Sequence, residues 1–419
     1  MKTKNALIID HLVGIPLCWS MNFAARLLGR VLRRDHQPPF QPKRVLFIKL
    51  MGAGSVVQAL PSMLGLAEQY PDADVRMMCF PETRGIASRI PFIKQIYTIE
   101  KTNILSLART SLKVLLDIVR WQPDLVLDLE YRSKFSSLLS SMTLALNRGG
   151  LFDSSTRFRS HLYTHLAYAN PRQHIADLYN HLARVFGAEN FKSLEESMKV
   201  LRIDPKDEEE VDALLSAHHI PAGTPLLVIN ANAGDLCLER RWPIERFGRV
   251  AQVLANHGQV LMVGSKPERD YVEEVMGQIP AVDGRAPLNV AGSVSFGGYL
   301  ALLRRSALVI TNDTGPMHMA AGLGAPTVSL WGPGSPHHYE PQVERHKALW
   351  AGIFCSACLY VTDVPPCNGH NVCMQAITVE AVLNAAAEVA PELGIPKREV
   401  PAPNPLPENM LLGVVCPER

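Results

Sequence analysis

Several side chains that could bind a sugar phosphate lie together within residues 307–341. Asp313, Thr314 and Gly315 follow a short apolar run, and a segment of small residues comes next. This order predicts a strand, a turn and then a helix whose first N–H groups are free to bind phosphate. The carboxylate of Asp313 could accept hydrogen bonds from sugar hydroxyls, and His318 lies one turn further along.

The Asp-Thr-Gly triplet has two other interpretations. It occurs in aspartic proteases, but there it lies in an all-β setting, which the helix-rich flanks here do not provide. It could also be a structural helix cap. A cap alone does not explain Pro316, His318 and the second turn, residues 332–334, that follows the next apolar run.

Further candidate ligand residues follow other apolar runs of the second half. Asn232 lies in a turn of small residues, Arg240 precedes a predicted helix, and Gly264 and Gly292 each end a short run. The carboxyl ends of parallel strands meet at one edge of a sheet, so we expect these residues to gather near Asp313. The ordinary alternatives are a solvated arginine and simple glycine turns.

The first half contains a glycine turn of its own. Gly52 and Gly54 follow the apolar run 44–50 and precede a predicted helix. A dinucleotide-binding fingerprint would need a third small residue, and Val57 stands at that position. An NAD(P)-dependent oxidoreductase is therefore the weaker alternative.

The elements that position these residues alternate along the whole chain. With 419 residues, 47% hydrophobic and 20% charged, the chain is long enough for two globular domains, and its net charge of +2 gives no reason to propose nucleic acid. Apolar runs separated by helical patterns predict an α/β fold with parallel sheets. We expect an amphipathic segment (1–42), two Rossmann-like domains (43–203 and 225–377) joined by a linker (204–224), and a C-terminal helix with a proline-rich tail (378–419).

The N-terminal segment suggests contact with a membrane surface. Residues 5–25 are mostly apolar, and four arginines follow within residues 26–34. A spanning helix needs about 20 apolar residues, and Asp10 and Pro16 interrupt this stretch. An interfacial helix with its arginines toward anionic lipid is the better interpretation. The alternative is a helix packed on the protein's own surface.

Four of the eight cysteines form a cluster near the C-terminus. Cys355, Cys358, Cys367 and Cys373 follow a C-x2-C-x8-C-x5-C pattern. No signal peptide is convincing, so a reducing cytosol is expected, where such clustering favours a metal over disulfides. The pattern indicates a structural zinc site; reduced or redox-labile thiols are the alternative.

Residues 43–378 resemble family 9 glycosyltransferases, the heptosyltransferases of lipopolysaccharide synthesis. Asp313-Thr314-Gly315-Pro316-x-His318 matches the family's Asp-(Ser/Thr)-Gly-Pro-x-His signature, and residues 326–333 are similar to its strand and Trp-Gly-Pro turn. The resemblance implies the GT-B architecture, two Rossmann-like domains facing across a cleft. It also implies inverting transfer of a heptose from a nucleotide-diphosphate donor such as ADP-heptose. The acceptor would be a lipid-linked saccharide at the inner face of the cytoplasmic membrane.

The resemblance assigns roles to the donor half. Asp313 would hold the sugar hydroxyls, and Thr314 and Gly315 the diphosphate. Arg240 takes the place of the family's lysine and keeps its positive charge. Since these groups would neutralise the diphosphate, and no paired-aspartate motif is evident, we expect no cofactor in catalysis.

The acceptor half departs from the family at one position. The usual catalytic aspartate lies six residues before the proline of a Leu-Pro pair, and here that residue is Ser55. Glu130, at the end of the apolar run 124–129, is the substitute base that we predict, and a salt bridge to Arg132 or Lys134 is its structural alternative. Because Ser55 stands in place of the catalytic aspartate, a second hypothesis is a catalytically silent sugar-nucleotide or glycan-binding protein.

Overall fold

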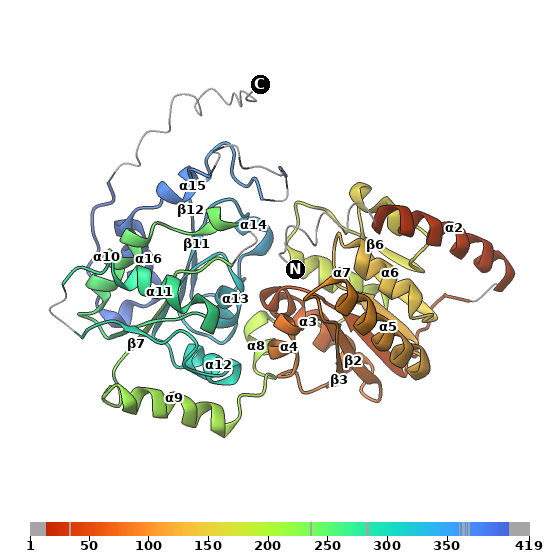
Figure 1. Ribbon diagram of the computed structural model, residues 1–419, viewed down its shortest axis with the longest axis horizontal. Coiled ribbons are helices and arrows are strands. Elements are labelled where there is room, and N and C mark those ends of the chain that lie inside the picture. Colours follow the sequence, from red (N-terminus) through yellow and green to blue (C-terminus); the bar gives the residue numbers. More distant parts are fainter. Residues whose placement is uncertain are drawn as a thin grey trace. The chain divides into compact units, whose positions relative to one another are not determined.

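The structure, a computed structural model, describes residues 14–32, 35–234, 237–281, 285–359, 361–362, 365, 367 and 369–401. The chain divides into two compact units between Arg202 and Ile203, and each contains one parallel sheet with helices. Figure 1 shows the elements of both units.

The first unit is built on six parallel strands in the order β3-β2-β1-β4-β5-β6. The strands are β1 (Arg44–Ile48), β2 (Asp74–Cys79), β3 (Ile93–Thr98), β4 (Leu125–Asp128), β5 (Asn147–Phe152) and β6 (His165–Tyr168). The central strands β1 and β4 are almost entirely buried, because helices cover both faces of the sheet, and so they read as continuous apolar runs.

Helices form two layers on this sheet. The helices are α2 (Gly14–Leu32), α3 (Ala53–Gln69), α4 (Pro81–Ala87), α5 (Ile104–Trp121), α6 (Lys134–Met142), α7 (Ile175–Val185) and α8 (Leu194–Met198), with the 3-10 helix η1 (Ser154–Arg159). α3 packs with α4, α7 and α8, whereas α5 and α6 share a core with the opposite face of β1, β2 and β4. α2 lies against α6 and η1 (Figure 1).

The second unit repeats this topology. Its strands are β7 (Leu226–Asn230), β8 (Gln259–Met262), β9 (Leu288–Asn289), β10 (Leu308–Asn312), β11 (Thr327–Trp331) and β12 (His346–Trp350). Their order β12-β11-β10-β7-β8-β9 is the order of the first unit, with β7 in the place of β1 and β10 in the place of β4. In both sheets the strand order reverses between these two central strands, and ligands of open α/β sheets bind beyond the strand ends at that point.

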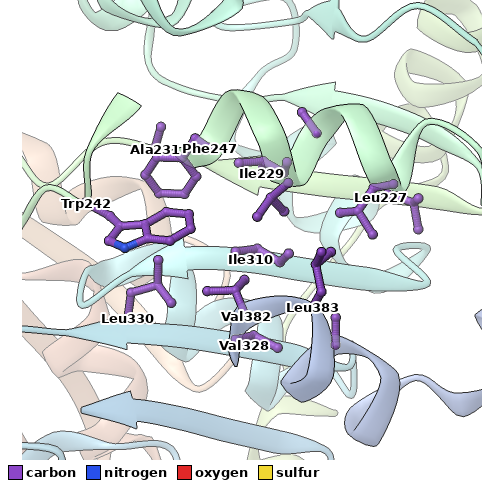
Figure 2. Close-up of a cluster of buried hydrophobic side chains, with 14 of the residues drawn as sticks. Leu227, Ile229, Ala231, Trp242, Phe247, Ile310, Val328, Leu330, Val382 and Leu383 are labelled. Carbon is purple, nitrogen blue, oxygen red and sulfur yellow. The ribbon is translucent and has the colours of Figure 1, made fainter. Parts of the chain in front are cut away.

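Helices pack on the sheet of the second unit. They are α9 (Pro205–Ala217), α10 (Ile244–Leu254), α11 (Arg269–Met276), α12 (Phe296–Arg304), α13 (Gly315–Gly322), α14 (Pro336–Tyr339), α15 (Val372–Gln375) and α16 (Val379–Val389), with the 3-10 helices η2 (Leu238–Arg240), η3 (Lys266–Glu268) and η4 (Pro391–Leu393). Figure 2 shows side chains of β7, β10 and β11 packed against α10 and α16. Trp242 is buried there, edge-on to Phe247, so it fixes the start of α10 on the sheet.

The α/β prediction is confirmed, and the details differ at a few segments. The predicted linker contains α9, which packs on α12 within the second unit. α6 ends at Met142, and β5 follows from Asn147. Residues 1–13 and 402–419, parts of the predicted N-terminal segment and tail, lie outside the described residues. Among the described helices, none combines the length and the apolar character needed to cross a bilayer.

Candidate donor site and acceptor-side edge

The predicted donor residues come together where β7 and β10 end. Asp313 and Thr314 follow β10 directly, and α13 begins at Gly315. The Asn230 amide nitrogen, at the end of β7, donates to the Thr314 hydroxyl (3.2 Å) and to the Thr311 hydroxyl (3.0 Å). The two strand ends are thus tied by side chains as well as by the sheet.

Asn312 is the centre of this edge. It is fully buried, and its amide nitrogen donates to the carbonyls of Ala231 (2.8 Å) and Asn232 (3.2 Å). Its Oδ1 accepts the backbone N–H of Trp242 (3.2 Å). One side chain therefore positions both the turn after β7 and the start of α10.

Arg240 and Asp313 lie side by side. The Arg240 guanidinium donates to the backbone carbonyl of Asp313 (2.7 Å) and to that of Ala233. Burial raises the pKa of Asp313 to about 6, although the nearby Arg240 charge lowers it. A Cβ at Gly334 would collide with the Asp313 carboxylate, so the turn after β11 closes over this side chain only because it carries glycine.

Asn232 is a buried side chain without a partner. It is 3% exposed, and neither its oxygen nor its nitrogen makes a hydrogen bond within the part of the chain that the structure describes. A Cβ on Gly264 would lie 2.9 Å from the Asn232 nitrogen, and the Gly292 N–H donates to the Gly264 carbonyl (2.9 Å). Unsatisfied buried amides are rare and costly, so Asn232 is the strongest mark of a ligand position at this edge.

The remaining donor candidates lie on α13. The side chain of Thr314, at the N-cap position, makes no capping bond, and Thr314 and Gly315 are partly exposed. Pro316 has no N–H, and the Met317 N–H donates to the Thr314 carbonyl (3.1 Å), so the Gly315 N–H is the group at this helix start that could bind a phosphate. His318 is buried one turn into the helix.

The corresponding edge of the first unit contains the acceptor-side candidates. Gly52 is the N-cap of α3 with a φ of 87°, a conformation that favours glycine, and Gly54 is buried in the first turn. Ser55 lies in the same turn, and a Cβ at Gly52 would approach its hydroxyl to 3.0 Å. The predicted loop and helix start are therefore present.

Glu130 lies beside this loop. Its Oε1 accepts the backbone N–H groups of Leu50 (2.7 Å) and Met51 (3.0 Å). The buried Lys49 ammonium is 3.1 Å from the same oxygen. The ion-pair partner is thus Lys49, and the carboxylate holds the loop that leads to Ser55.

Asp128 belongs to a separate buried network. Its carboxylate accepts from the Ser136 hydroxyl (2.7 Å) and from the Tyr163 hydroxyl, and the Arg159 guanidinium is 3.5 Å away. Burial raises the pKa of Asp128, although the Arg159 charge and the hydrogen bonds from Tyr163 and Ser136 lower it. This side chain is a structural element of the unit.

The four clustered cysteines line one small cavity together with Glu239. Burial and neighbouring thiols raise the pKa of Cys373 to about 12, and burial likewise raises the pKa values of Cys355 and Cys358. Among the described residues, no group of three or more His, Cys, Asp or Glu side chains is arranged to hold a metal ion.

The cysteine loop is attached to the donor edge. The Leu359 N–H donates to the Pro333 carbonyl (2.9 Å), and the Ser356 hydroxyl donates to the Gly332 carbonyl. The Asn371 amide donates to the Arg241 carbonyl (2.6 Å). The loop therefore supports both the glycine turn beside Asp313 and the segment that carries Arg240.

Sequence reasoning missed the supporting residues Asn230 and Asn312. Both are polar side chains at the last position of an otherwise apolar strand. That pattern was a usable signal, because a buried amide at a strand end must bond across to a neighbouring segment.

Comparisons with known proteins agree with this geometry. Residues 114–367 match the family model described as "Glycosyltransferase family 9 (heptosyltransferase)". The lipopolysaccharide core heptosyltransferase OpsX of Haemophilus influenzae is 24% identical over 297 residues, 69% of this chain and 79% of that protein.

Two solved structures show the same fold. The ADP-heptose lps heptosyltransferase II of E. coli matches with a TM-score of 0.66 at 18% identity, over 83% of this chain and 99% of that one. The iron-containing dodecameric glycosyltransferase TibC of enterotoxigenic E. coli matches with a TM-score of 0.50 at 12% identity, over 84% and 77%. The architecture is GT-B, and the chain belongs to glycosyltransferase family 9.

Proposed function

We propose that this glycosyltransferase moves a heptose, or a related sugar, from a nucleotide-diphosphate donor to a lipid-linked saccharide of the lipopolysaccharide type. The preferred donor is ADP-heptose, and the transfer inverts the anomeric centre without a metal ion. The observation that carries the donor site is the buried, unpartnered carboxamide of Asn232 beside Asp313 and Arg240. A relative whose name contains ADP-heptose supports the choice of donor.

Each donor-site residue contacts the part of the donor that suits its charge or its hydrogen-bonding groups. The Asp313 carboxylate accepts hydrogen bonds from sugar hydroxyls, and Thr314 and the Gly315 N–H, at the start of α13, bind the diphosphate. Arg240 adds a positive charge, and its two bonds to backbone carbonyls hold the guanidinium in place. Asn232 supplies a donor and an acceptor, and Gly264 and Gly292 let the nucleotide approach the strand ends closely.

Calorimetry with ADP, UDP, GDP, NAD and ADP-heptose, each with and without EDTA, tests the donor site. Selective binding of ADP and ADP-heptose that survives EDTA is the expected result. A preference for UDP or GDP would mean that the donor contains that nucleotide instead of ADP, and the proposed donor site would stand. Binding of NAD alone would favour an oxidoreductase, and binding of none of the five would remove the donor assignment.

Glu130 is the proposed base that takes the proton of the acceptor hydroxyl. The contacts to Lys49, Leu50 and Met51 all involve Oε1, so Oε2 is the oxygen that would receive the proton. If the protein is instead a silent binding protein, ADP-heptose will bind but no acceptor or water will be glycosylated. A turnover assay with extracted lipopolysaccharide precursors separates the two.

The four cysteines are the proposed ligands of a structural metal, zinc or iron. The four cysteines line one cavity, and thiolates are ligands that both ions accept, although the sulfurs of these described residues are not arranged as a metal site in this structure; TibC is described as iron-containing. Since the thiols must lose their protons to bind, metal uptake should increase with pH. Elemental analysis of the purified chain and of Cys358→Ser tests this, and an equal metal content in both, or none in either, would exclude the site.

The proposed place of work is the inner face of the cytoplasmic membrane, where a lipid-linked acceptor is reached from the same side as the nucleotide donor. The exposed side chains of the first unit give separate evidence on contact with a membrane surface.

A further inference from the structure

The outer face of α2 is apolar, although it is exposed. Trp19 is 54% exposed and Phe23 is 67% exposed, and Leu17 and Leu27 are also exposed. Trp19, Phe23 and Leu27 are four residues apart and so form one stripe along the helix. An exposed stripe of large apolar side chains marks a surface that contacts something other than water.

The inner face of α2 packs on the unit: Cys18 and Met21 join an apolar cluster with Phe158, and Asn22 lies on the same face. Cys18 is fully buried, and Asn22 is 3% exposed. The Asn22 amide nitrogen donates to the Phe158 carbonyl, and its oxygen accepts the His161 N–H (2.8 Å). Because these contacts fix one face of α2 on the unit, the apolar face is held outward.

The apolar surface continues on the same side of the sheet. Sixteen large apolar side chains are exposed in the described part of the chain, and eleven of them lie on α2, on α5 or within residues 142–146. On α5, Leu112 and Leu116 point away from the core that contains Val114 and Ile118. Exposed large apolar side chains are therefore concentrated on this helix layer.

The same layer is basic. Among the side chains that the structure describes on α2, α5 and α6, one is acidic, Asp117, and five are basic: Arg26, Arg109, Lys113, Arg120 and Lys134. The helices α3, α4, α7 and α8, which pack together on the opposite face, contain five acidic residues and two arginines. The whole chain is nearly balanced, with 42 basic and 40 acidic residues, so the asymmetry is local.

We infer that the layer formed by α2, α5 and α6 is a docking surface for an anionic lipid bilayer. The stripe Trp19-Phe23-Leu27 would enter the interface between headgroups and acyl chains, and the surrounding arginines and lysines would contact lipid phosphates. A second copy of the chain is a poorer occupant, because two such layers face to face would bring ten positive charges together against two negative ones. The inference deepens the proposed function, since it places the enzyme where a lipid-linked acceptor is found.

Vesicle co-sedimentation of the full chain, without donor or acceptor, tests the inference. The chain should bind vesicles of phosphatidylglycerol and phosphatidylcholine in equal parts, bind phosphatidylcholine vesicles more weakly, and lose binding as salt is added. The double variant Trp19→Ser/Phe23→Ser should reduce the partition coefficient by about tenfold or more. The matched control is Tyr168→Ser, since Tyr168 is 66% exposed on β6 and outside the layer.

A second measurement uses Trp19 as a probe. Brominated lipids should quench part of the tryptophan fluorescence of the wild type, and Trp19→Phe should bind vesicles but lose that part. Wild-type binding by the double variant, or no vesicle binding by the wild type, would overturn the inference. The inference would also be overturned if the wild type associates with itself, the double variant does not, and neither binds vesicles. In each case ADP-heptose calorimetry on the same samples reports separately on the proposed function.

Discussion

At the edge where β7 and β10 end, Asn232 is buried with neither carboxamide atom bonded. At the corresponding edge of the first unit, the Glu130 carboxylate is bonded to Lys49 and to two backbone N–H groups. The two sheets share one topology, so the difference lies in the loops. In the second unit the Asn232 carboxamide has no bond among the described residues, whereas the Glu130 carboxylate of the first unit is bonded to the loop beside it.

The largest effect on activity is expected for Glu130→Gln, which tests whether the bonded carboxylate of the first unit is the catalytic base. If Glu130 is the base, kcat should fall at least about hundredfold while the KM for the donor changes little. Steady-state kinetics with the donor and a lipopolysaccharide acceptor measure both.

Lys49→Met is the matched control, because it removes the ion pair but keeps the carboxylate. It should retain more turnover than Glu130→Gln. Equal losses of thermal stability in the two variants, with equal turnover, would show that Glu130 only supports the loop.

In the donor edge, Asp313→Asn should weaken donor binding by about tenfold to hundredfold, because the hydrogen bonds lost are to a charged acceptor. Calorimetry with ADP-heptose and with ADP measures it. The affinity for ADP should change less, since Asp313 is assigned to the sugar. Equal losses for both ligands would contradict that assignment.

The same variant should stabilise the unliganded protein at high pH. The pKa of Asp313 is raised from 3.8 to about 6, so ionisation favours the unfolded chain at high pH. The stability that the protonated group provides is complete below about pH 4 and is lost as the pH rises through about 6, a difference of up to about 3 kcal/mol. Urea unfolding should therefore show Asp313→Asn more stable at pH 8 and no more stable than the wild type at pH 4.

Asn232→Ala tests the open side chain directly. Donor affinity should fall by about tenfold, a loss of roughly 1 to 2 kcal/mol. The thermal midpoint should hardly change, because Asn232 has no partner inside the protein to lose.

Asn312→Ala is the contrasting variant at the same edge. It leaves two carbonyls and one N–H without their partner, so the free energy of unfolding should fall by roughly 2 to 4 kcal/mol. Equal destabilisation by the two variants would mean that Asn232 has a structural role.

The smallest effect is expected for Ser55→Asp. The first turn of α3 contains no acidic residue, and a carboxylate is favourable at a helix start, so the variant should fold. If Glu130 is the base, turnover should change little. Turnover that appears only in Ser55→Asp would identify the natural protein as a silent binder.

The donor edge was predictable because its residues are close in sequence to strand ends that read as apolar runs. Asp313 and Asn232 were assigned from such positions and Arg240 from the family resemblance, and the structure brings all three to one edge. The bonds of Glu130 were not predictable, because Lys49 and the Leu50 and Met51 amides lie about 80 residues away along the chain.

β5 shows a second limit. Its sequence, NRGGLF, contains two glycines, which strands disfavour. In the structure a Cβ on Gly150 would lie 2.8 Å from the Tyr163 ring, and one on Gly149 would collide with Phe186. Close packing with distant aromatic rings explains the glycines, and no local pattern shows it.

The burial of Asp313 has a consequence for the calorimetry itself. Near pH 6 about half of the unliganded molecules hold a proton on this carboxylate, as its pKa of about 6 implies. If donor hydroxyls bind the ionised form, binding releases that proton, and the buffer takes it up. The measured heat will then differ between buffers of different ionisation enthalpy, and the slope of that dependence counts the protons released. Asp313→Asn should bring the slope close to zero, so a change of buffer alone can report whether the sugar contacts this side chain.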